Sequence, residues 1–131
     1  MAITTTTIID DAAELVKVKG HTQALTSSLQ TKYLRLLNQM LNSWRNEGVN
    51  LGLDTLAQGD TIYVDEADEL CIFYNLALMI AQSVGRQISP EVREMAITTL
   101  NSLKAKYFTQ KELDQSELLL NNINTNILTG A

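Results

Sequence analysis

The chain of 131 residues has one cysteine, one proline and one histidine. A single cysteine forms no internal disulfide, so Cys71 is expected to be a free thiol in a reducing cytosol. One proline and six glycines leave little material for the many turns of an all-β fold. No apolar run reaches the roughly 18 residues that span a bilayer. Met1–Thr7 has neither the basic residues nor the apolar core of a secretory signal. We therefore expect neither a membrane-spanning nor a secreted protein.

The residues that usually perform catalysis or hold metals are also scarce. His21 lies in a predicted connector, and Cys71 lies in the most apolar helix with no histidine near it in sequence. The scattered glycines form no phosphate-binding loop. One acidic group lacks the spacing of a calcium loop, and helix capping explains most of it; its members are Asp60, Asp65, Glu66, Asp68 and Glu69. We expect no catalytic residue, no cofactor and no metal site. A hydrolase with two carboxylates about 5–10 Å apart remains the enzymatic alternative.

Positive charge is sparse as well. The net charge is −5, and the ten lysines and arginines form no cluster beyond Lys17/Lys19 and Lys104/Lys106/Lys111. Proteins that grip DNA tightly neutralise phosphates with a basic face. Tight or sequence-specific binding of nucleic acid is therefore not expected, whereas an acidic surface suits a channel through which DNA slides.

What the sequence does have is 45% apolar residues with helical periodicity. The spacing predicts four main helices near 8–19, 28–47, 65–84 and 90–107, in an all-α bundle. Residues 48–64 break this period and predict an irregular segment or a hairpin of Val49–Leu53 against Thr61–Val64. We divide the chain into a helical domain, 1–108, and a C-terminal helix or extended arm, 109–131. The predicted core includes Leu37, Leu41, Trp44, Tyr74, Asn75, Leu78, Ala96 and Leu100.

Capping residues define the expected helix ends. Thr7 is predicted to cap the first helix, Asp65 the third, and Ser89, followed by Pro90, the fourth. Gly48 fits the left-handed residue that ends the second helix. The third helix is apolar nearly all round, which is typical of a central helix.

Trp44 and Asn75 are the two most informative single residues. Trp44 ends an apolar helical stripe, so it is predicted to be a core residue, with an interface anchor as the alternative. Asn75 lies between Tyr74 and Leu76 on the apolar third helix. A buried amide needs partners, and a nearby backbone group is expected to supply one.

The order of several short motifs along the chain is also informative. Leu36 to Trp44 is followed by Gly48 and Val49, then by Tyr74 to Leu78, Gly85, and Ile88 to Val92, with Ala96 and Leu100 beyond. This order resembles the head-completion adaptors of tailed bacteriophages, most of all the tail accessory factors of short-tailed phages. The resemblance covers roughly residues 8 to 105 and consists of structural residues. Related adaptors occur in long-tailed phages too.

The resemblance implies a structural virion protein at the head–tail interface, made in the host cytoplasm. It implies a ring, twelvefold in the family, that assembles on the portal after DNA packaging, extends the DNA channel and carries later tail proteins. The expected partners are the portal protein, other copies of the chain and tail proteins, with DNA only passing through and no membrane. The residues expected at the interfaces are Leu51, Leu53, Tyr63, Ile123, Ile127 and Leu128. A stand-alone helical interaction or regulatory domain is the alternative.

Overall fold

The computed structural model describes residues 2–17 and 25–108. Within these residues it contains helices α1 (Thr5–Leu15), α2 (Ser27–Asn46) and α3 (Glu66–Ser83), and a fourth helix over residues 90–108. Two three-residue strands, β1 (Ala2–Thr4) and β2 (Thr61–Tyr63), form the one small sheet of the described part. The all-α class and the four main helices are therefore confirmed.

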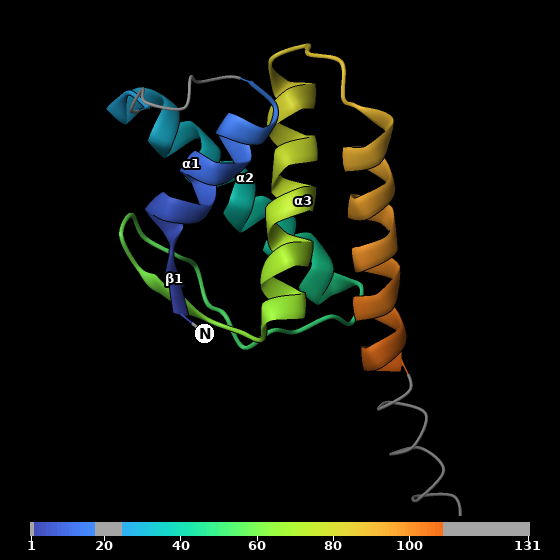
Figure 1. The fold of residues 1–131 in the computed structure, drawn as a ribbon. Helices are drawn as coiled ribbons and strands as arrows, with labels where there is room; N and C mark the ends of the chain where they lie inside the picture. Colours follow the sequence, from blue (N-terminus) through green and yellow to red (C-terminus); the bar gives the residue numbers. More distant parts are fainter. Residues whose placement is uncertain (1, 18–24, 109–131) are drawn as a thin grey trace, which may run out of the picture.

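The central position belongs to α3 (Figure 1). Helix α1 lies on one side of it, and the fourth helix runs alongside its other side. Helix α2 contacts both α1 and α3 and passes behind α3 in this view. Both flanks of α3 are thus covered, as its apolar sequence requires. The neighbouring helices do not cover all of α3, however, since the Leu70 side chain is 46% exposed.

The first helix begins earlier than the sequence predicted. Thr4, and not Thr7, is the N-cap, and its Oγ1 accepts a hydrogen bond from the Thr7 amide at 3.2 Å. Four consecutive threonines offer four equivalent caps, so tertiary contacts decide among them. The Thr5 amide donates to the Asp60 carbonyl at 2.8 Å, and the buried Thr5 hydroxyl donates to the Ala57 carbonyl at 3.0 Å. The helix end is also shifted, to Leu15.

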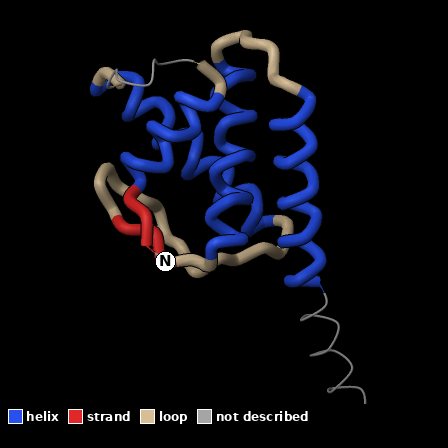
Figure 2. Tube along the Cα trace, in the orientation of Figure 1, coloured by secondary structure: helices blue, strands red, loops and turns tan. Residues whose placement is uncertain are grey.

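The predicted hairpin partner is wrong. β2 pairs antiparallel with β1 at the N-terminus, with Ile3 opposite Ile62, and not with Val49–Leu53 (Figure 2). Ile62 is fully buried, so the strand pair closes one edge of the core. Residues 47–60 contain no strand and form the irregular segment that was the other expectation.

Side chains of α2 hold this irregular segment in place. The Asn38 amide donates to the Leu56 carbonyl at 2.9 Å, and its oxygen accepts from the Leu56 amide at 2.8 Å. The Arg45 guanidinium donates to the Leu53 carbonyl at 2.9 Å. The Asn38 side chain thus satisfies both the N–H and the C=O of Leu56, as a neighbouring strand would otherwise do.

The other helix ends lie close to the predicted ones. Thr26 caps α2 by accepting from the Leu29 amide, and Ser89 caps the fourth helix by accepting from the Val92 amide. Asp65 occupies the N-cap position of α3 but makes no side-chain capping hydrogen bond. Its carboxylate instead lies 3.6 Å from the Lys106 ammonium on the fourth helix.

The predicted core residues fall into two groups. Leu37, Leu41, Trp44, Asn75 and Ala96 are buried. Tyr74, Leu78 and Leu100 are only half-buried. Leu100 still packs against the core cluster, whereas Tyr74 and Leu78 do not belong to it. Tyr74 contacts its neighbour Phe73, with ring centroids 4.9 Å apart.

Candidate functional site

The end of α2 is a rigid corner built on Trp44. After this residue the chain turns through Gly48 at φ 98°, and the Val49 amide donates to the Trp44 carbonyl at 2.8 Å. An L-residue adopts such a φ only with strain, which favours glycine here. The Lys104 ammonium lies 3.1 Å from the Glu47 carboxylate, so the corner is also joined to the fourth helix.

Asn75 joins α3 to the fourth helix. Its amide nitrogen donates to the Ala96 carbonyl at 3.1 Å and to the Cys71 carbonyl, one turn earlier on α3, at 2.8 Å. Asn75 is buried and Ala96 is fully buried. The backbone partner expected for this amide is therefore the Ala96 carbonyl.

A shallow hollow of about 250 Å³ marks the place where these segments meet. Trp44 from α2 and Asn75 and Leu78 from α3 line it, together with Met40 and Met79. Two segments that carry the resemblance, residues 36–44 of α2 and 74–78 of α3, thus meet at this hollow although they are distant in sequence.

The residues predicted for interfaces are dispersed. Tyr63 is 75% exposed on β2, while Leu51 and Leu53 are half-buried and pack against the core. Leu51 and Leu53 therefore contribute to the fold in the subunit itself. Ile123, Ile127 and Leu128 lie outside the described residues.

The acidic group around the start of α3 is partly neutralised by one lysine. The Lys106 ammonium lies 3.7 Å from the Asp68 carboxylate and 3.6 Å from that of Asp65. Asp68, and to a lesser extent Asp65, raises the pKa of Lys106. Asp60 has another role, since its carboxylate accepts from the Ala57 amide at 2.7 Å and closes the loop before β2.

Cys71 is placed as an unreactive thiol. It is 1% exposed, and burial raises its pKa to about 11. The thiolate is the nucleophilic form of cysteine and is scarce at neutral pH when the pKa is this high. His21 lies outside the described residues, and in the parts of the chain that are described, no three histidine, cysteine or acidic side chains gather as a metal site.

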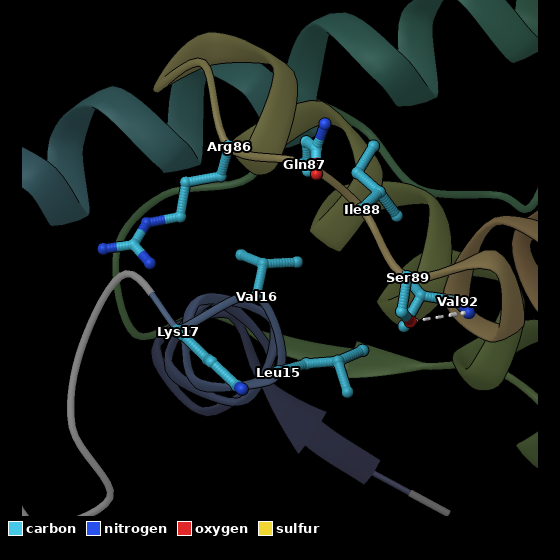
Figure 3. Close-up of a pocket in the computed structure, with 8 residues that line it drawn as sticks. All are labelled: Leu15, Val16, Lys17, Arg86, Gln87, Ile88, Ser89 and Val92. Atoms are coloured by element: carbon cyan, nitrogen blue, oxygen red, sulfur yellow. Dashed lines mark hydrogen bonds between the residues drawn. The ribbon is translucent and has the colours of Figure 1, made fainter.

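A second hollow, of about 260 Å³, lies between the end of α1 and the start of the fourth helix (Figure 3). Val16, Ile88 and Val92 give it an apolar lining, and two cations, Lys17 and Arg86, border it. Their charged ends diverge in Figure 3 and do not face each other across Val16. The hollow therefore offers no convergent pair of charges to one anion.

Apolar side chains remain uncovered along α3 and the fourth helix. Leu70 is 46% exposed, and Ile97 and Phe108 are each 52% exposed. A groove of about 340 Å³ runs between these two helices, with Leu70, Thr98 and Leu103 in its lining. None of the described helices combines the length and apolar content that a bilayer crossing requires.

No protein-family model matches the chain, and no curated protein matches its sequence.

Proposed function

We propose that this chain is a head-to-tail adaptor of a tailed bacteriophage. In this proposal its copies assemble as a ring on the portal of a filled head, extend the DNA channel and provide the platform for tail proteins. The role is structural, and the chain performs no chemistry.

The observation that supports the proposal is that two of the segments that carry the resemblance, residues 36–44 and 74–78, meet at one junction. Trp44, Asn75 and Leu78 line a common hollow, and Asn75 reaches the backbone of Ala96. Residues that carry a structural resemblance are expected to lie where helices join, and not at scattered surface positions. The placement of Trp44 and Asn75 at such a junction supports the proposal.

The architecture also suits a subunit that must fit between neighbours. The corner after α2 is fixed by Gly48, by the hydrogen bonds of Arg45 and Asn38, and by the ion pair of Glu47 with Lys104. The uncovered apolar residues of α3 and the fourth helix give neighbours a surface to bury. In the proposed ring, a rigid wedge of this kind meets the next copy along that edge.

Disruption of the gene in the phage that encodes this chain tests the proposal in its biological setting. We expect portal-bearing heads that package DNA, lose it on purification and carry no tails. Plasmid-borne wild-type protein restores tailed particles, and purified virions contain the chain in a fixed ratio to the portal. A stand-alone regulatory domain would be absent from virions, and its loss would leave the assembled particles intact.

A further inference from the structure

Among the four helices of the described residues, only α2 has no carboxylate side chain. Its twenty residues, Ser27–Asn46, include Lys32, Arg35 and Arg45 but no aspartate or glutamate. The whole chain carries a net charge of −5. A helix with three positive charges on an acidic protein is a local reversal of the field.

Most polar residues of α2 lie on one face, whereas Gln30 is buried on the opposite side. At the helical angle of about 100° per residue, positions 31, 32, 35, 38, 39, 42 and 45 share an arc of less than half the circumference. Lys32 lies at the edge of this arc and is half-buried. Thr31, Arg35, Gln39 and Asn42 are exposed, and Asn38 and Arg45 are half-buried. This face therefore presents hydroxyl, amide and guanidinium groups to the solvent, and no carboxylate.

The face is hollowed into a groove of about 500 Å³, whose far wall is formed by Thr55. The groove is lined by Thr31, Leu34, Arg35, Asn38, Gln39, Asn42, Arg45 and Thr55. The hydrogen bonds of Asn38 to Leu56 and of Arg45 to Leu53 hold this wall against α2. Asp54, the carboxylate next to the wall, is exposed and does not line the groove.

The cations of this face are available to a ligand. No ion pair joins Lys32, Arg35 or Arg45 to a carboxylate of the described residues, whereas Lys104 and Lys106 are both paired. The Arg45 guanidinium is oriented by the Leu53 carbonyl and by the Asn42 side chain at 3.4 Å. A guanidinium has five N–H donors, so these two contacts leave others for a bound anion.

We infer that the polar face of α2 binds the phosphate backbone of nucleic acid, weakly and without reading sequence. Arginine, lysine, amide and hydroxyl groups are the side chains that contact phosphate and sugar in such complexes. Positions 31 to 45 extend about 21 Å along the helix, which matches about six phosphate steps of one strand of duplex DNA. The inference does not depend on assembly with a portal, because it concerns a face of the isolated subunit.

Salt dependence gives the binding a quantitative signature. Three cations that neutralise three phosphates predict a slope of about −2.7 for log affinity against log salt concentration, so affinity falls roughly 40-fold between 50 and 200 mM salt. We would measure this by fluorescence anisotropy with labelled duplexes of two unrelated sequences, which should bind equally.

Charge-reversal pairs locate the binding surface. Lys32→Glu/Arg35→Glu removes two cations of the face and leaves Arg45 to hold its loop. Arg86→Glu/Arg93→Glu is the matched control, because it makes the same change in net charge at two exposed residues outside α2. We expect the first pair to lower the affinity at 50 mM salt more than tenfold and the control to lower it less than threefold.

Two results would overturn the inference. Equal losses in both pairs would mean that the net charge of the chain governs the binding, and not α2. If the wild-type protein shows no salt-dependent binding of the duplexes at 50 mM salt, the polar face of α2 does not bind the phosphate backbone. Circular dichroism melts of all variants test whether the substitutions leave the fold intact, including that of the half-buried Lys32.

Discussion

Asn75 allows a sharp test of the junction between α3 and the fourth helix. Its amide makes two hydrogen bonds, to the Cys71 and Ala96 carbonyls, in a buried position. A hydrogen bond contributes about 0.5–1.5 kcal/mol net, so Asn75→Ala should lower the free energy of unfolding by about 1–3 kcal/mol. For a domain of this size, that corresponds to a fall of roughly 4–12 °C in melting temperature.

Asn75→Asp extends the test with pH. The introduced carboxylate would face two carbonyl oxygens in a buried site, so the folded state raises its pKa above the unfolded value of about 3.9. The folded state then binds more protons than the unfolded state, and stability falls as pH rises. We expect Asn75→Asp to be close to Asn75→Ala at pH 4.5 and clearly less stable than it at pH 7.5.

Urea denaturation and thermal melts, both followed by circular dichroism, measure the stability of both variants. Asn101→Ala serves as the control, because Asn101 is exposed on the same fourth helix and should change stability by no more than about 0.5 kcal/mol. The reasoning is refuted if Asn75→Ala melts within 2 °C of the wild type. It is also refuted if the Asn75→Asp penalty does not depend on pH.

Three further outcomes are expected. Leu41→Ala should lower the free energy of unfolding, measured by thermal melts, by about 2–5 kcal/mol, as large-to-small core changes do. Leu78→Ala should lower it less, because Leu78 is half-buried. Equal losses would contradict the assigned helix faces. Cys71, the only cysteine, should resist a thiol reagent at pH 8 in the native protein and react fully in urea; rapid native labelling would contradict its burial. Deletion of residues 122–131, rich in Asn and Thr, should leave the melting temperature of the free subunit nearly unchanged and abolish assembly on the portal; a truncated protein that unfolds would place this segment in the core.

The four helices were predictable because their apolar residues recur over long stretches. A helix N-cap was also predictable where only one residue suits it, as Ser89 before Pro90 illustrates. The start of α1 was not, because Thr4 to Thr7 are locally equivalent and only the contacts of Thr5 with Ala57 and Asp60 distinguish them. The partner of β2 was missed for the same kind of reason, since β1 lies almost sixty residues away in sequence.

The burial pattern of α3 exposes a second limit of sequence reasoning. The sequence of a helix that is apolar on all sides does not indicate which side faces the core. Leu70 and Leu78 therefore could not be distinguished from the buried Leu76. The polar face of α2 was missed because a search for clustered cations overlooks residues spaced along a helix. The absence of acidic residues from 27–46 is the signal that would have identified it.

Assembly on the portal tests the central proposal most directly. The purified chain would be mixed with the portal protein encoded in the same genome, and particle masses and images recorded by mass photometry and electron microscopy. The account predicts a ring on one face of the portal, with a mass increase of twelve times the 14.6 kDa of one chain. Portal particles whose mass and outline do not change at saturating concentrations of the folded chain would contradict it.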